Sequence, residues 1–221
     1  MELNPSVKRR YPELTIGYAI ARNVKVERIE KKLEDEKKSV VKEIQGKYAS
    51  TPVLEIPEVK AYREFYKALG VDPTKVRPPV EYLLRKAMAG SFPSINNLVD
   101  LCLLASVRHS AIVSVYDLDK TKGNLTIDIA RGDETLQLID GRTVTPAMGE
   151  VLLRDEEKIL TAYTLGDAKA TMVTPQTKNA LLIAWNVSGI SRQQVEAALN
   201  LTTDYATRFC QATVEKSEIL T

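Results

Sequence analysis

The stretch that decides the fold runs from Arg77 to Gly141 and holds four segments: RPPVEYLLRKAMAG (77–90), SINNLVDLCLLAS (94–106), VSVYDLDK (113–120) and TLQLIDG (135–141). Residues 95–107 are apolar on nearly every side, and a helix of that kind belongs in the interior of a protein. After this helix the period of the apolar residues changes to two, which predicts strands. The stretch therefore indicates a buried helix packed against a sheet.

Strand-like runs lie on both sides of the buried helix. Turns at Lys122–Asn124 and Arg131–Asp133 would join the first three runs after the helix as hairpins, and the pair Asp140-Gly141 would close a further turn. The predicted strands are 15–26, 111–116, 125–130, 134–139, 158–163, 170–173 and 181–187.

Helical patterns occupy much of the remaining chain. Residues 26–46 carry an apolar stripe among many Lys and Glu residues, formed by Val26, Ile29, Leu33, Val40 and Ile44. A second helix is predicted over 59–69, and a third begins near Pro79. The last helix opens with a capping box made by Ser191 and Gln194.

Helices come early, strands follow, and a helix closes the chain. That order favours an α+β fold with a mostly antiparallel sheet core packed with helices. At 221 residues the chain is expected to form a single domain, 1–221. Residues 1–75 would supply an N-terminal strand and helices, and residues 76–213 would form the core.

Composition indicates an ordinary folded protein, with 44% hydrophobic and 27% charged residues. No apolar run approaches the about 20 residues that a membrane span needs. The N-terminus lacks the apolar core of a signal peptide, so a cytoplasmic location is expected. Cys102 and Cys210 lie in apolar helical patterns, which favours buried thiols over a disulfide.

The charge balance alone does not indicate a nucleic-acid-binding protein, because the net charge is only +2. Cations nevertheless gather at Lys8, Arg9 and Arg10 and in the segment 25–47. Either a local basic patch or a solvated helix face with mixed charges would account for them.

Several kinds of chemistry lack the residues they need. The single histidine, His109, follows the buried helix, where the helix C-terminus favours a cation, so a capping or surface role is expected. One histidine and two cysteines are too few for a zinc site. Neither a GxxxxGK[ST] loop nor a GxGxxG fingerprint is present. No metal and no cofactor is therefore expected.

Polar residues gather around the central strands. Asp117 and Asp119 follow the strand VSVY at alternate positions, so both would project to one side. A solvated strand end would also explain them. Asn96 and Asn97 are natural caps at the start of the buried helix.

Asp100 is the unusual member of this group, because it lies among apolar residues. A buried carboxylate should be paired, and Arg77 or Arg85 would supply the partner, with a ligand role as the alternative. A polar run also precedes the strand LLIAW and consists of Thr171, Thr174, Thr177, Lys178 and Asn179. As loop residues these are individually ordinary.

In order and spacing, four segments resemble the editing module of the phenylalanyl-tRNA synthetase beta subunit, which removes wrongly attached amino acids from tRNA. They are INNLVDLCLLAS, VSVYDLDK, LQLIDG and TPQTKNALL. The resemblance covers roughly Arg77 to Cys210 and implies the fold of that module. The chain is similar to free-standing relatives of the module found in bacteria and archaea.

The resemblance implies a pocket that hydrolyses the ester of mis-acylated tRNA. A hydrophobic synthetic site rejects an analogue with one added hydroxyl only about a hundred-fold. A second, polar pocket would accept the wrong amino acid and direct water at the ester carbonyl. Catalysis would then rest on positioning and hydrogen bonds rather than on a triad.

The resemblance also assigns site residues. Ser114, Asp117 and Asp119 would be catalytic, with Ser114 at the position where bacterial synthetases often carry a histidine. Serine can orient water but is a poor base near neutral pH. The substrate would be bound by Asn96, Asn97, Tyr116, Gly141, Thr171, Thr174 and Asn179, and the tRNA phosphates by Lys8, Arg9 and Arg10.

Two other interpretations of the chain remain open. The protein would be a non-catalytic binder of tRNA or of an amino-acid-like small molecule. Alternatively, it would be a structural partner that docks on an aminoacyl-tRNA synthetase through its N-terminal helix.

Overall fold

A computed structural model describes residues 1–221. Its helices are α1 (Pro5–Arg10), α2 (Lys31–Lys47), α3 (Pro57–Ala68), α4 (Pro79–Met88), α5 (Asn97–His109) and α6 (Arg192–Cys210). Its strands are β1 (Glu2–Leu3), β2 (Ile16–Arg22), β3 (Ile112–Asp117), β4 (Thr126–Ile129), β5 (Leu136–Gln137), β6 (Thr143–Val144), β7 (Val151–Arg154), β8 (Ile159–Ala162), β9 (Gly166–Asp167), β10 (Ala180–Trp185) and β11 (Thr213–Leu220). Short 3-10 turns lie at η1 (Val53–Glu55), η2 (Leu118–Lys120) and η3 (Lys169–Thr171).

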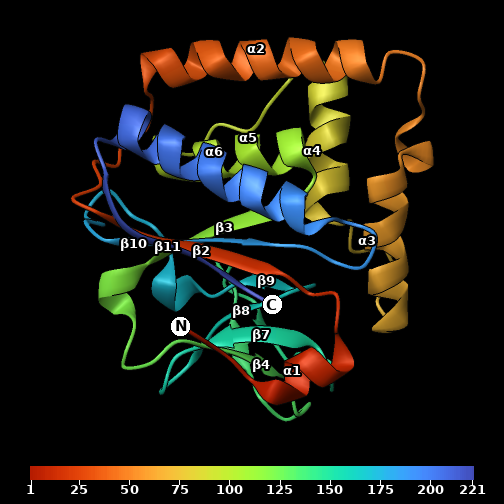
Figure 1. The fold of residues 1–221 in the computed structure, drawn as a ribbon, viewed down its shortest axis with the longest axis vertical. Helices are drawn as coiled ribbons and strands as arrows, with labels where there is room; N and C mark the ends of the chain where they lie inside the picture. Colours follow the sequence, from red (N-terminus) through yellow and green to blue (C-terminus); the bar gives the residue numbers. More distant parts are fainter.

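Two sheets carry the fold. The first has the strand order β11-β2-β10-β3 and is antiparallel throughout. The second has the order β1-β4-β7-β8-β9, in which only β1 and β4 are parallel. Figure 1 shows most of the helices above the first sheet and the second sheet below it. The predicted α+β fold with a mostly antiparallel core is thereby confirmed.

Helix α5 is the buried helix that the sequence predicts. Leu101 and Leu104 are fully buried, and the helix packs against β3 and α6. The side chain of Asn96 caps it by accepting a 2.9 Å hydrogen bond from the N–H of Val99. The helix ends at His109, after which Ser110 adopts the left-handed conformation with a φ of 55°.

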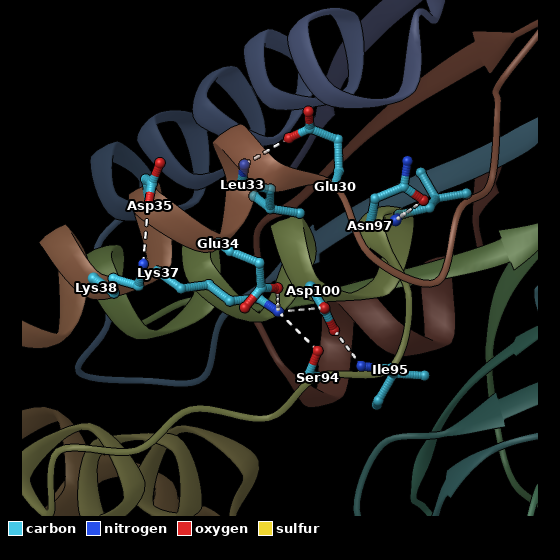
Figure 2. A network of polar contacts seen from close by, with 11 residues as sticks. Glu30, Leu33, Glu34, Asp35, Lys37, Lys38, Ser94, Ile95, Asn97 and Asp100 are labelled. Carbon is cyan, nitrogen blue, oxygen red and sulfur yellow. Dashed lines mark hydrogen bonds and ion pairs between the residues drawn. The ribbon is translucent and has the colours of Figure 1, made fainter.

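The carboxylate of Asp100 is paired, but with a different residue from those predicted. It lies 2.6 Å from the Lys37 ammonium of α2, and both side chains are buried (Figure 2). Arg77, which precedes α4, and Arg85, which lies in α4, instead flank the buried Glu81 of that helix, at 3.5 and 3.0 Å. The prediction failed because Glu81, four residues from each arginine in the chain, pairs with both of them locally.

The long N-terminal helix begins five residues later than predicted. It starts at Lys31 after Glu30, and Ile29 stays exposed before it. The preceding segment is held extended by α5: the N–H of Glu27 donates to the Asn97 side chain, and the N–H of Asn97 donates to the Glu27 carbonyl. That tertiary contact overrides the helical periodicity.

The predicted hairpins around Lys122–Asn124 and Arg131–Asp133 are wrong. Strands β3 and β4 belong to different sheets, and β4 pairs with β1 and β7 rather than with β5. The single sheet expected against α5 is therefore two sheets. The turn at Asp140-Gly141 does close a hairpin, between β5 and β6, and Gly141 supplies the positive φ of 89° that this turn requires.

The run 170–173 forms a 3-10 turn and an extended segment instead of a strand. Lys169–Thr171 tighten into the 3-10 turn η3, so the first half of the run cannot extend as a strand. The confirmed elements include the capping box of α6, made by Ser191 and Gln194. Cys102 and Cys210 are buried free thiols, as predicted. None of the helices has the length and apolar character that a membrane crossing requires.

Candidate functional site

A cavity of about 200 Å³ lies where the two sheets meet. Strand β3 ends the first sheet and β9 ends the second, so a terminal strand of each sheet reaches the cavity. The cavity is lined from the start of α5 by Ile95, Asn96, Val99, Cys102 and Leu103, from β3 by Val113, Ser114, Val115 and Tyr116, from the β5–β6 hairpin by Ile139, and from β9 and η3 by Asp167, Ala168, Thr171, Met172 and Val173. The cavity is thus mostly apolar, with a few polar groups.

Four consecutive residues of β3 line the cavity because it runs along the free edge of that strand. β3 pairs with β10 alone, and alternate residues of such a strand turn their backbone groups toward and away from the partner. The N–H of Leu118, just after β3, donates to the Asn179 carbonyl just before β10, whereas the N–H of Val113 donates to the Ser106 hydroxyl. The odd-numbered residues of β3 therefore point their backbone N–H and carbonyl groups away from β10.

Two polar side chains meet at the cavity wall. The Tyr116 hydroxyl donates a 2.9 Å hydrogen bond to the Asp167 carboxylate. Burial raises the pKa of Asp167, and the hydrogen bond from Tyr116 opposes that rise. Burial likewise raises the pKa of the Tyr116 phenol well above its usual range. The phenol therefore stays protonated at neutral pH and acts as the donor of this hydrogen bond.

The hydroxyl of Thr171 is the most informative polar group of the cavity. The residue is fully buried, and its hydroxyl oxygen has no hydrogen-bond partner within the protein. A buried hydroxyl without a partner costs free energy, so native proteins rarely keep one. The residue also lines the cavity, so a molecule bound there is the candidate for the missing partner.

The predicted site residues separate into two groups. The structure brings Ser114, Tyr116, Asn96 and Thr171 together at the cavity. Those that do not line it are Asn97, Asp117, Asp119, Gly141, Thr174 and Asn179.

Asp117 and Asp119 tie β3 to the loop before β10. Buried Asp117 accepts a 2.7 Å hydrogen bond from the Thr177 hydroxyl and lies 3.2 Å from the Lys120 ammonium. Asp119 is exposed and accepts a 2.7 Å hydrogen bond from Asn179. Both carboxylates therefore have structural partners.

Asn97 and Thr174, also outside the cavity, likewise have partners within the protein. The Asn97 amide accepts from the N–H groups of Glu27 and Leu98 and donates to the carbonyls of Lys25 and Phe209. These four hydrogen bonds satisfy both the oxygen and the nitrogen of the Asn97 side-chain amide. The Thr174 hydroxyl accepts from the backbone N–H of Gln176 at 3.3 Å.

Sequence reasoning missed Asp167, the one carboxylate that lines the cavity. The available signal was a Gly-Asp pair, Gly166-Asp167, directly after the strand predicted at 158–163. Cys102 was also missed as a lining residue. Burial raises the pKa of its thiol well above the usual range, so it is not a nucleophile at neutral pH.

The structure shows no preformed metal site, since no three His, Cys, Asp or Glu side chains converge. His109 lies outside the cavity at the end of α5. Burial and the neighbouring Arg108 lower its pKa.

The predicted tRNA-binding residues Lys8, Arg9 and Arg10 lie in α1, away from the cavity. Helix α1 contacts β4, and β1 and β4 begin the second sheet, whereas Asp167 lies in β9 at its other end. Helix α2 is linked to one lining residue, because the Lys37 partner Asp100 accepts a 2.9 Å hydrogen bond from the N–H of Ile95, and Lys37 also contacts Ser94 at 3.2 Å. Figure 2 shows this network beside the start of α5.

Fold and cavity define the class of this protein: an α+β module in which the terminal strands of two sheets enclose a ligand-sized pocket. A family model described as the B3/4 domain matches residues 61–218, and the chain belongs to that family. It is a relative of the module that the phenylalanyl-tRNA synthetase beta subunit carries.

Relatives and a solved structure agree with this placement. The chain is 26% identical over 134 residues to the phenylalanine–tRNA ligase beta subunit of Fusobacterium nucleatum, covering 61% of the chain and 17% of that subunit. It is 28% identical over 132 residues to that of Ruegeria pomeroyi, covering 60% and 16%. An N-terminal fragment of the phenylalanyl-tRNA synthetase beta subunit from Pyrococcus horikoshii has a similar fold, with a TM-score of 0.51 at 14% identity, covering 96% of the chain and 49% of the fragment. The chain thus corresponds to a small part of its full-length relatives.

Proposed function

We propose that this chain is a trans-editing hydrolase that binds mis-acylated tRNA and cleaves its aminoacyl ester. Membership of the B3/4 family and a cavity of about 200 Å³ with few polar groups support the proposal. In the reaction a water oxygen attacks the ester carbonyl carbon, and the bond from that carbon to the ribose oxygen breaks. The products are a free amino acid and a tRNA with a free terminal hydroxyl.

The polar residues of the cavity would divide the work. Thr171 and Asp167 would bind a polar group on the wrong amino acid, which an apolar amino acid cannot offer. Ser114 is half-buried on β3 and would orient the attacking water. Asp117, Asp119 and Asn179 would hold the end of β3 in place rather than touch the substrate. Catalysis would then depend on positioning, since the cavity contains no histidine.

The observation that carries the proposal is the unpartnered, fully buried hydroxyl of Thr171 in the cavity wall. The experiment is a deacylation panel in which the full chain is incubated with each correctly and wrongly aminoacylated tRNA. Release of amino acid from a restricted set of mis-acylated tRNAs is expected. Failure to accelerate release from any of them would refute the hydrolase.

A specific observation favours one alternative, a non-catalytic binder of amino-acid-like molecules. Ser114 is a poor base, and burial raises the pKa of the Cys102 thiol. Neither residue is therefore a strong nucleophile or a base at neutral pH. Saturable binding of a free amino acid, measured by NMR titration, together with no deacylation would establish that alternative.

tRNA is the proposed partner, and the cytoplasm the proposed location, because the matched relatives are by name phenylalanine–tRNA ligases. An association with a synthetase through α2 is a further proposal. Copurification of the full chain with a synthetase, lost when tRNA is digested, would show that RNA bridges the two proteins rather than a direct contact.

A further inference from the structure

The backbone of Val115 is a polar feature of the cavity that the side chains alone do not reveal. Val113 and Val115 have the same parity on β3, and the N–H of Val113 points away from β10, onto the Ser106 hydroxyl at 2.8 Å. The N–H and carbonyl of Val115 therefore also point away from β10. No side chain of the protein bonds to either group, and Val115 lines the cavity.

A free edge of this kind has a defined ligand chemistry. In an antiparallel pair, two facing residues exchange both of their N–H···O bonds. A molecule with a donor nitrogen and a carbonyl on adjacent carbons can make the same exchange with a single edge residue. Peptides that extend an exposed sheet edge are bound in this way.

We propose that Val115 binds the α-aminoacyl group itself, with its carbonyl accepting from the substrate α-ammonium and its N–H donating to the ester carbonyl. This inference rests on the proposed function but addresses the part of the substrate that every amino acid shares. Thr171, unpartnered in the same cavity, faces the part that differs. Val115 is thus the general anchor and Thr171 the selective one.

The same N–H has a role in the chemical step. When water adds to the ester carbonyl, negative charge develops on the carbonyl oxygen, and a fixed N–H donor stabilises it more strongly than it stabilises the starting ester. The charge leaves that oxygen when the carbon–ribose-oxygen bond breaks, and the proton of the attacking water ends on the ribose hydroxyl. β3 holds this N–H rigidly, because the residues on either side of it, Ser114 and Tyr116, direct their backbone groups toward β10.

The test replaces the Val115 amide by an ester, by incorporating α-hydroxyisovaleric acid at position 115 of the full chain. The substitution removes one N–H and leaves every side chain unchanged. The melting temperature should fall only slightly, because this N–H has no partner in the protein and the ester merely weakens the Ser114 carbonyl as an acceptor on the side of β10. Deacylation should fall by about 10²–10³-fold, the usual effect of losing one oxyanion donor. Val115→Pro, tolerated where an edge N–H faces outward, provides a second deletion of the same donor.

The matched control is the same ester at Val113, whose N–H faces the same way but is bonded to Ser106. That variant should lose more thermal stability than the Val115 ester, because it also loses the hydrogen bond to Ser106. A Val115 ester variant that deacylates at the parent rate would overturn the inference and leave the hydrolase intact.

Binding gives a readout that does not depend on hydrolysis. The probes are L-tyrosinamide, L-phenylalaninamide, L-alaninamide and L-serinamide, each compared by NMR titration with the analogue in which hydrogen replaces the α-ammonium. At least one amide should bind the parent protein, and its deamino analogue should bind about tenfold or more weakly. The Val115 ester variant should bind the amide more weakly but keep this preference, because its Val115 carbonyl is intact. Such binding without any deacylation would refute the hydrolase but keep the anchor. Equal binding of amide and deamino analogue, or no binding of any amide, would overturn the anchor.

Discussion

The hydroxyl of Tyr116 donates a 2.9 Å hydrogen bond to the carboxylate of Asp167, and these residues belong to the terminal strands of different sheets. The N–H of Ile139 also donates to the Asp167 carbonyl, at 3.2 Å, so the β5–β6 hairpin is attached at the same place. Three parts of the chain thus meet at one acidic residue. The shape of the cavity depends on how those parts are held together.

The unpartnered hydroxyl of Thr171 should make stability and ligand binding respond in opposite directions. Thr171→Val removes a buried hydroxyl without a partner, so the free energy of unfolding should rise by roughly 1 kcal/mol. The same change should weaken ligand binding and slow deacylation. Denaturant unfolding and the deacylation assay measure the two effects.

Thr202→Val is the matched control, because the buried Thr202 hydroxyl donates a 2.7 Å hydrogen bond to the Ala198 carbonyl. That variant should be destabilised and should leave the cavity unchanged. A Thr171→Val protein that is both less stable and fully active would show that the hydroxyl has a structural role.

Removing the charge of Lys37 should destabilise the protein strongly. Lys37→Met would leave the Asp100 carboxylate buried without its ammonium partner, at a cost of about 3–5 kcal/mol. Lys38→Met is the control one residue away, where both members of the ion pair with Asp35 are exposed and the expected change is about 0–1 kcal/mol. Urea unfolding compares the two, and equal effects would contradict the importance of burial.

The pH dependence of stability should identify Asp167. Burial raises its folded pKa above the ordinary 3.8, so in the pH window above 3.8 the folded state holds the proton more tightly than the unfolded state. Its contribution is therefore fully present below 3.8 and is lost as pH rises through the folded pKa. Asp167→Asn should remove this fall in stability, measured by thermal unfolding across the acidic range.

Asp155 provides a comparison of opposite sign. Burial works to raise its pKa, but the Lys158 side chain and backbone N–H groups outweigh burial and lower it below 3.8. The contribution of Asp155 to folding stability is present above pH 3.8 and is lost as pH falls through the folded pKa. Asp155→Asn should reduce the loss of stability that the protein shows as the pH falls. The same trend for both variants would refute the assignment of either carboxylate.

Asp117 should prove to be a structural residue. A double-mutant cycle of Asp117→Asn and Thr177→Val should give a coupling energy of about 0.5–3 kcal/mol, since the two side chains share a buried 2.7 Å hydrogen bond. Asp119→Asn, at an exposed position, should change stability by no more than about 0.5 kcal/mol. Deacylation that collapses in Asp117→Asn at unchanged stability would instead place this carboxylate in the active site.

The cations that bind tRNA should be those of α2 rather than those of α1. Lys31, Lys32 and Lys42 are exposed and form no ion pairs, and Lys37 of their helix pairs with Asp100, which accepts from the N–H of the cavity residue Ile95. Replacing all three with Ala should weaken tRNA binding and reduce its salt dependence by roughly 0.9 in the log–log slope for each phosphate that the protein no longer neutralises. The matched triple variant replaces Lys8, Arg9 and Arg10, and a larger loss of affinity in that variant would reverse the assignment.

Sequence patterns predicted the elements whose signals are local and failed where a distant partner decides. The all-round apolarity of α5 and the capping box at Ser191 each lie within one segment, and both predictions are confirmed. The start of α2 depends on Asn97, about 70 residues away, which holds Glu27 in an extended conformation. The predicted hairpins failed because strand order is set by the packing of whole sheets rather than by turn residues.

The cavity shows the same division. Ser114, Tyr116 and Thr171 were selected from motifs and do line it. Asp167 was missed because a Gly-Asp pair is common in turns, and only the pairing of β9 with β8 brings it opposite Tyr116. The orientation of the Val115 backbone depends on which neighbour β3 pairs with, which no single segment encodes.

The position of β2 has a consequence for the newly made chain. β2 leaves the ribosome early, but both of its neighbours in the sheet, β10 and β11, come from the C-terminal part of the chain. Roughly 160 residues separate Arg22 from the start of β10, so at about 5–20 residues per second β2 waits roughly 8–32 seconds with both edges unpaired. Slow translation would therefore prolong the exposure of this apolar strand to chaperones and to other nascent chains.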